Sequence, residues 1–177
     1  MSADAVGITR RWLQQVVIGH NLCPFAAREL DAGRVSFVSC EEQEPEALLL
    51  ALATQVEALV EDPATETTLL VFPYALGDFD DYLDFLALTQ LWLEDSGMEG
   101  DFQFASFHPD YCFDGCQPED ASNYTNRSPL PVIHILREES VEKAIAAHPD
   151  PDMIPHRNIA LAGQKGSAFW RELLAGL

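Results

Sequence analysis

The stretch Thr67-Thr-Leu-Leu-Val-Phe72 is a continuous apolar run, which is typical of a strand buried on both faces of a sheet. Helical patterns flank it on both sides. Pro45 to Val60 carries leucine and valine at helical spacing, and a longer helix is predicted from its N-cap at Asp78 to Ser96-Gly97. Strands separated by helices predict at least one parallel βαβ unit with helices packed on the sheet.

Three more strands are predicted around this central one, at Arg34 to Ser39, Phe102 to Phe107 and Val132 to Leu136. The last two have no helix between them, so we expect antiparallel neighbours. The predicted fold class is α/β, with α+β as an alternative. It is a four-stranded mixed sheet covered by helices, with the element order α-β-α-β-α-β-β-α-α, in a single domain of residues 1–177.

The core of this order is shared with the thioredoxin fold, so a thioredoxin-like core topology is possible. That fold would place a functional thiol between the first strand and its helix, where Cys40 stands. The acidic run Glu41 to Glu44 follows, and no second cysteine has the Cys-x-x-Cys spacing. We therefore do not expect thioredoxin-like chemistry, because acidic neighbours disfavour a thiolate.

Further helices are predicted at Thr9 to Ile18, Pro24 to about Leu30, Ser140 to His148, from Pro155 onward, and Ser167 to Ala175. Proline at the first helical position would make Cys23 the N-cap, where partial positive charge favours a thiolate. Cys23 is therefore a candidate catalytic residue. The alternative is a small buried side chain at a tight turn, since free cysteine is among the most buried residue types.

The chain has 10 Lys and Arg against 29 Asp and Glu, which gives a net charge of −19. Such a field repels nucleic acid and anionic membrane surfaces, so we expect neither as a partner. Only Lys143 and Lys165 are lysines, so recognition of an anion falls mainly to eight arginines. The N-terminal residues lack a targeting pattern, and no apolar run is long enough to span a bilayer. We therefore expect a cytoplasmic protein with reduced cysteines.

The segment 109–131 is a long polar loop between two strands, and such loops often bind ligands. His108 stands where the loop begins, and Arg127 offers a planar fork suited to carboxylate or phosphate. His134 lies in the following strand and is expected to be neutral, so His108 and His134 are candidate proton carriers. The further ligand-binding candidates are Asn123, Thr125, Asn126, Ser128, Arg137, Arg157 and Asn158.

Several motifs, in order over nearly the whole chain, resemble a bacterial family of about this length. It is catalogued as domain of unknown function 1415. The motifs are Leu22-Cys-Pro-Phe-Ala26, Phe107-His-Pro, Asn123-Tyr-Thr-Asn-Arg-Ser-Pro129, His134-Ile-Leu-Arg137, and Ile154-Pro with Arg157-Asn-Ile159. The resemblance implies a single-domain, cytoplasmic bacterial protein. No catalytic residue carries over, because the family has no assigned reaction.

Two classes of function follow from the candidate residues. The first is an enzyme acting on a small anionic molecule, in which His108, Arg127, His134 and the Asn123–Asn126 turn line one pocket. The second is a non-catalytic domain that binds a ligand or another protein through the same loop. The structural interpretation of each residue alone is a turn-building side chain or a satisfied core histidine.

Zinc binding through His108, Cys112 and Cys116 is a further alternative. These three soft ligands lie within nine residues, but their spacing is unlike a tight zinc knuckle with a second pair elsewhere. Cys112, Cys116 and His156 also lie outside the family pattern. We therefore predict no cofactor, and we expect the protein to fold without stoichiometric metal.

Overall fold

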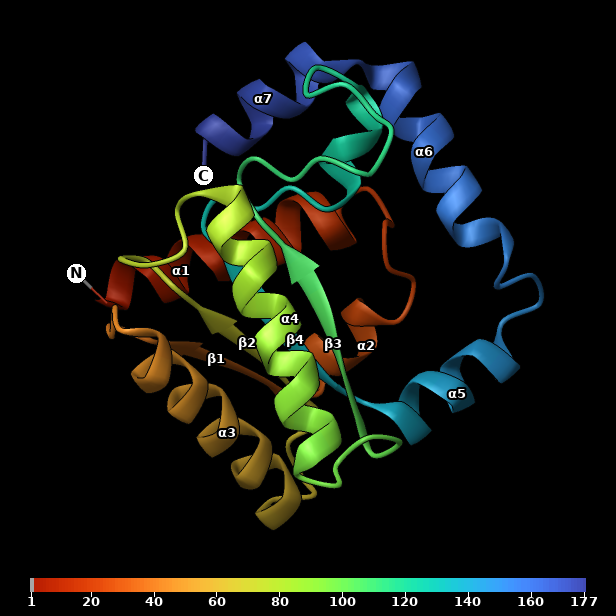
Figure 1. The fold of residues 1–177 in the computed structure, drawn as a ribbon. Helices are drawn as coiled ribbons and strands as arrows, with labels where there is room; N and C mark the ends of the chain where they lie inside the picture. The colour runs from red at the N-terminus through yellow and green to blue at the C-terminus, as the bar shows by residue number, and fades with distance from the viewer. Residues whose placement is uncertain (1) are drawn as a thin grey trace.

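A four-stranded mixed sheet organises the computed structural model, which describes residues 2–177 (Figure 1). The strand order is β1-β2-β4-β3. β1 and β2 are parallel, whereas β4 is antiparallel to both β2 and β3. This arrangement confirms the predicted βαβ unit and the predicted antiparallel pairing of the last two strands. The strands are β1 (Val35–Ser39), β2 (Thr67–Val71), β3 (Phe102–Phe107) and β4 (Val132–Arg137).

Two long helices, α3 (Pro45–Glu61) and α4 (Phe79–Asp95), cover one face of the sheet (Figure 1). Every residue of β2 is buried, as its unbroken apolar run predicts. Leu70 packs toward α3 and α4, whereas Leu69 belongs to the core on the opposite face. Asp78 caps α4 as predicted, because its carboxylate accepts from the N–H groups of Asp80 and Asp81.

The opposite face is covered by both ends of the chain. Trp12 and Trp170 are fully buried there, together with Leu69, Val71 and Val132 from the two central strands. In Figure 1, α5, α6 and α7 form an arc along the side of the sheet. The remaining elements are α1 (Ser2–Trp12), η1 (Leu13–Ile18), α2 (Ala26–Asp31), η2 (Ala121–Thr125), α5 (Glu138–Ala147), α6 (Met153–Lys165) and α7 (Ser167–Ala175).

The N-terminal helix is longer than predicted and changes character along its length. It begins at Ser2 instead of Thr9, and its final segment, Leu13–Ile18, is a π-helix. The predicted end before Gly19 is confirmed. A Cβ at Gly19 would lie 2.3 Å from the carbonyl oxygen of Gln15, so the tight exit from the π-helix requires glycine.

Three further predicted helix starts are wrong. The second helix begins at Ala26 with Phe25 as N-cap, so Cys23 lies in the preceding turn and caps no helix. α5 begins at Glu138, directly after β4, because the Glu138 N–H is held by the carbonyl of Asp101. α6 begins at Met153 and contains Pro155 in its first turn, where a missing N–H costs no helical hydrogen bond.

The predicted order of elements is confirmed, and the likeness to the thioredoxin fold ends there. Here the β3–β4 hairpin joins the parallel pair through its second strand, β4, which pairs with β2. The thioredoxin fold attaches its hairpin through the first of the two strands. Among the described helices, none is both long and apolar enough to cross a membrane.

Candidate functional site

The polar side chains of the motif 123–129 form hydrogen bonds mainly within the loop that contains them. Asn123 is fully buried, its Oδ1 accepts from the N–H of Phe113 at 3.0 Å, and its Nδ2 donates to the carbonyl of Gln117 at 2.8 Å. Asn126 Nδ2 donates to the carbonyl of Ser106 at 3.1 Å. Thr125 and Ser128 likewise donate to nearby carbonyls. These bonds satisfy backbone groups that a long loop would otherwise leave unpaired.

Arg127 fastens the same loop. Its Nε donates to the carbonyl of Tyr111 at 3.1 Å, and its Nη2 donates to the carbonyl of Pro118 at 2.7 Å. The guanidinium also lies over the Tyr124 ring, 4.6 Å from its centroid. The planar fork that was expected to bind an anion therefore holds two turns of the loop against each other.

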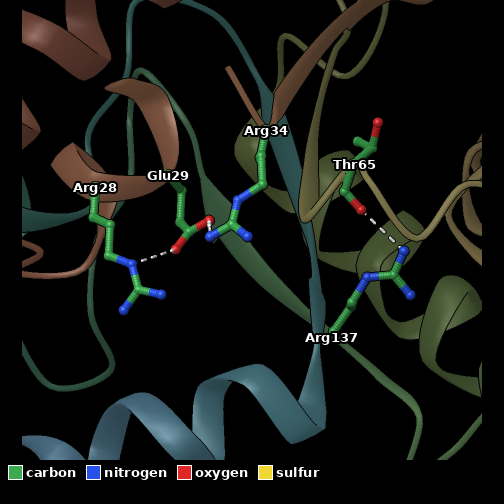
Figure 2. A network of polar contacts seen from close by, with 5 residues as sticks. All are labelled: Arg28, Glu29, Arg34, Thr65 and Arg137. Carbon is green, nitrogen blue, oxygen red and sulfur yellow. Dashed lines mark hydrogen bonds and ion pairs between the residues drawn. The ribbon is translucent and has the colours of Figure 1, made fainter. Parts of the chain in front are cut away.

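Arg137 and Arg157 also donate to main-chain carbonyls. Arg137 donates to the carbonyls of Leu59, Asp62 and Thr65, where α3 ends, and Figure 2 shows its bond to Thr65. It thus supplies donors for the end of a helix whose last carbonyls lack intrahelical partners. Arg157 donates to the carbonyl of Asn21 at 2.7 Å.

Asn158, the neighbour of Arg157 in α6, donates to the carbonyl of Leu22 at 2.6 Å. Together the two side chains fix the turn that leads into Cys23. Asn21 adopts a φ of 52° in this turn, in the left-handed region that asparagine tolerates better than most residues. The motif in α6 therefore positions the motif around Cys23.

His108 is a satisfied core histidine. It is fully buried, with Phe79 and Tyr82 beside its ring. Its Nδ1 accepts from the N–H of Asp110 at 3.0 Å, so its Nε2 carries the proton and donates to the carbonyl of Leu76 at 2.9 Å. Burial lowers the pKa of His108, which keeps the ring neutral. Neither ring nitrogen is left for a ligand.

The three side chains of the zinc alternative are not assembled into a site. Both nitrogens of His108 are occupied, the Cys112 thiol contacts the carbonyl of Cys116 at 3.5 Å, and the Cys116 thiol lies 3.9 Å from the Ser122 hydroxyl. In residues 2–177, no group of three or more His, Cys, Asp or Glu side chains is placed to hold a metal ion.

A cavity of about 300 Å³ lies between the sheet, η1, α2 and α5. Its walls are mostly aliphatic and aromatic. Of the predicted site residues, Cys23, His134 and Arg137 line it, whereas His108 and Arg127 do not. The cavity therefore does not join His134 to the polar loop in the way that the sequence predicts. The apolar walls include Leu13, Val17, Val35, Leu69, Phe107, Leu136, Val141 and Ala144.

His134 presents one free nitrogen at this cavity. The Thr67 hydroxyl donates its only proton to the carbonyl of Ile135 at 2.5 Å, so it accepts from His134 Nε2 at 2.7 Å. Nδ1 is then unprotonated and has no hydrogen-bond partner among the described residues. Burial lowers the pKa of His134 to about 4. At neutral pH the imidazole is a fixed, neutral hydrogen-bond acceptor.

Two carboxylates line the same cavity. Glu29 Oε2 forms an ion pair with Arg34 Nη2 at 2.5 Å, and Glu29 Oε1 lies 3.6 Å from Arg28 Nε (Figure 2). Glu66 forms no ion pair among the described residues, and its Oε1, like Glu29 Oε2, is shielded from solvent without a hydrogen-bond partner in residues 2–177. Glu29, Glu66 and Thr67 were not predicted as site residues. The available signal was polar residues, Glu66 and Thr67, at the start of an apolar strand.

A second cavity, of about 320 Å³, adjoins the first, and Val17, Cys23 and Phe107 line both. Its lining draws on four of the five motifs that carry the family resemblance, and His134 of the fifth lines the first cavity. The motifs thus meet around the two cavities, with Cys23 between them. The motif residues lining the second cavity are Leu22, Cys23, Phe107, Thr125, Asn126, Ile154, Pro155, Asn158 and Ile159.

These features define an α/β protein with two adjoining cavities on one face of a four-stranded mixed sheet. A family model described as "Protein of unknown function (DUF1415)" matches residues 4–172, so the chain belongs to this family. Comparisons with curated proteins and with solved structures found no match. The functional argument therefore rests on the geometry of the cavities.

Proposed function

We propose that the protein binds a small, largely apolar molecule in the first cavity, with His134 as the polar contact. The observation that carries this proposal is the pairing of apolar walls with one neutral imidazole, fixed by Thr67 and left with a free acceptor. Ligand pockets are commonly apolar with a few well-placed polar groups, and about 300 Å³ suits a small ligand.

The same geometry gives less support to an enzyme that binds an anion through arginine. Arg127, Arg137 and Arg157 each donate to main-chain carbonyls. At the first cavity, Glu29 is already paired with Arg34, Glu66 is acidic, and the Arg137 guanidinium donates to carbonyls at the end of α3. With a pKa of about 4, His134 is a weak base, whereas a general base works best near the operating pH. Binding is therefore the proposed role.

A cavity-filling variant tests this proposal. Ala144 lines the cavity from α5, so Ala144→Leu should occupy the space, while Ala146→Leu adds the same side chain on the exposed side of the helix. The probe is benzyl alcohol, which has an apolar ring and one hydroxyl, and binding is measured by ligand-observed NMR. We expect Ala144→Leu to weaken binding at least about tenfold, because the leucine takes the space that the ring would occupy, and Ala146→Leu to leave it unchanged. Equal binding to both variants would overturn the proposal.

One observation favours a second candidate, thiol catalysis. Cys23 and His134 both line the first cavity, and a thiol near a neutral imidazole is a common nucleophile and base. The test is the rate at which iodoacetamide alkylates Cys23 at pH 7, followed by mass spectrometry. A base role predicts a much slower reaction in His134→Gln. An unchanged rate would leave Cys23 as a wall residue of the cavities.

The proposal places the protein in the cytoplasm of a bacterium. Support comes from four free cysteines among the described residues, because thiols persist in reducing compartments. The net charge of −19 supports the expectation that nucleic acid and anionic membrane surfaces are not partners. Native gel electrophoresis of the purified protein with RNA, and light scattering with anionic vesicles, would test that expectation. Association at physiological salt would contradict it.

A further inference from the structure

We infer that the outer side of α4 is a docking surface for a basic, amphipathic segment of another protein. This surface, the α4 stripe, consists of Leu83, Ala87, Leu88 and Leu91, which are all exposed. The two cavities lie on the opposite face of the sheet, so the inference does not depend on what they bind.

α4 is apolar on two opposite sides. Its inner side supplies Tyr82, Phe85 and Leu93 to the core between the helix and the sheet. Its outer side carries the α4 stripe, whose members are three to five residues apart and therefore lie side by side on the helix. Leu91 is 57% exposed, and no helix or strand lies in front of α4 in Figure 1. A helix that is apolar all round is normally buried, so the exposed stripe indicates a surface that a partner covers.

α3 provides the comparison. It has the same length and covers the same face of the sheet, but its exposed large apolar residues, Leu50 and Val60, are ten residues apart. Leu50 is flanked on the helix surface by Glu46, Thr54 and Glu57. Single exposed apolar side chains are usual on a protein surface and need no partner. The clustering of such side chains therefore distinguishes α4 from α3.

The residues around the α4 stripe carry only negative charge. Asp80 and Asp84 lie toward its start, and Glu94 and Asp95 lie at its end. The segment 35–126 contains no Lys or Arg, and in residues 2–177 no basic side chain forms an ion pair with α4. Glu94 and Asp95 also lie in the last turn of the helix, where the helix dipole makes negative charge unfavourable. Cationic side chains of a partner would offset that cost.

These charges select the occupant of the surface. A second copy of the chain would bring the same stripe with the same acidic ends, so like charges would face each other in either orientation. Nucleic acid and anionic membranes are repelled for the same reason. A helical segment with apolar side chains along one side and Lys or Arg at both ends matches the stripe and its borders, because amphipathic helices dock through side chains at such spacing.

The test uses a synthetic amphipathic peptide with leucine along one side of a helix and lysine at both ends. A scrambled peptide has the same composition without the helical spacing, and a third peptide has glutamate in place of lysine. Fluorescence anisotropy with the full-length protein at physiological salt measures the binding. The first peptide should bind at least about tenfold tighter than either control, because it alone can bury its leucines while pairing its charges.

Two matched pairs of variants locate the binding. Leu91→Gln should weaken it about tenfold, as expected when one leucine contact is lost. Leu50→Gln, the same change at a more exposed position of α3, should leave it unchanged. Glu94→Gln should weaken binding about threefold, as for one exposed ion pair, whereas Glu57→Gln on α3 should not. Glutamine favours a helix, so the variants should fold normally, which circular dichroism checks.

Three results would overturn the inference. Equal binding of the ordered and scrambled peptides would reduce the attraction to net charge alone. Equal effects of Leu91→Gln and Leu50→Gln would place the contact away from the α4 stripe. Sedimentation of the protein by itself, or its binding to neutral vesicles, gives the third: a dimer or a vesicle complex that is lost in Leu91→Gln would make a second copy or lipid the occupant.

Discussion

The loop 109–131 and the cavity beside β4 both place polar residues near strand ends, but they use those residues differently. In the loop, Asn123 and Arg127 bond to carbonyl and N–H groups of the loop itself. At the cavity, His134 keeps one free nitrogen and Glu66 has a shielded oxygen without a partner. The comparison teaches that polar density marks a well-fastened loop, whereas an isolated polar group in an apolar strand can keep an atom without a hydrogen-bond partner.

The largest expected effect is in the loop. Asn123→Ala leaves the Phe113 N–H and the Gln117 carbonyl without their partner in a partly buried setting. We expect a loss of about 4 kcal/mol in the free energy of unfolding, at about 1–3 kcal/mol for each unsatisfied group. Urea denaturation measures it. Ser122→Ala removes a hydroxyl that contacts the Cys116 thiol at 3.9 Å and the exposed Asp120 carboxylate, so it should change stability little. Equal effects would mean that Asn123 is not a fastening residue.

The next effect is a dependence of stability on pH that comes from the cavity. The folded-state pKa of His134 is about 4, below the ordinary 6.5, so protonation favours the unfolded state. Its contribution is complete above pH 6.5 and is lost as the pH falls toward 4. We expect this residue to account for about 3 kcal/mol of the stability lost between pH 7 and pH 4.

The control for this prediction is His134→Gln, which removes the titration. Burial also lowers the pKa values of His20 and His108, so they act in the same direction and remain in the variant. The difference between wild type and variant, measured by chemical denaturation at both pH values, therefore isolates His134. Parallel pH profiles would show that its imidazole is not held neutral by burial.

A smaller effect distinguishes a loop fastener from a ligand-binding residue. Arg127→Ala should lower the free energy of unfolding by about 2 kcal/mol, because two carbonyls lose charged donors. The affinity for benzyl alcohol should not change, since Arg127 does not line the cavity. Arg127→Lys should restore only part of the stability, because lysine lacks the planar fork. A loss of affinity with unchanged stability would show instead that Arg127 is a ligand-binding residue.

Much of the fold could be predicted from the sequence, because it is decided by the spacing of hydrophobic residues and by the residues that begin and end helices and strands. The apolar run at β2, the helical spacing in α3 and the cap at Asp78 each specify structure within a few residues. The helix starts near Cys23 and Ser140 could not be predicted in the same way. Tertiary hydrogen bonds decide them, through Arg157 and Asn158 in one case and Asp101 in the other.

The candidate site could be predicted only in part. His134 and Cys23 were identified because each is unusual in its local setting, and both line the cavity. The roles of Asn123, Arg127 and Arg137 depend on which carbonyls lie within reach, and some of these are far away in sequence. Arg137, for example, donates to Leu59 and Thr65 in another part of the chain. Sequence pattern does not encode such distances.

The smallest expected effect concerns the volume of the first cavity, beside β4. Ala144→Leu adds apolar atoms to a cavity of about 300 Å³, and leucine and alanine both favour a helix, so the change tests packing and leaves helix formation nearly unaltered. We expect the free energy of unfolding to rise by about 1 kcal/mol, which is usual for cavity filling, whereas Ala146→Leu on the exposed side should change it by less than about 0.5 kcal/mol. Thermal and urea unfolding of both variants measure the difference. If filling the cavity stabilises the fold, the natural sequence maintains the cavity at a cost in stability. A role in binding a ligand would explain why that cost is maintained. If Ala144→Leu is destabilising instead, the cavity walls are too rigid to accept a leucine. The cavity is then a packing defect on this face of the sheet and does not support ligand binding.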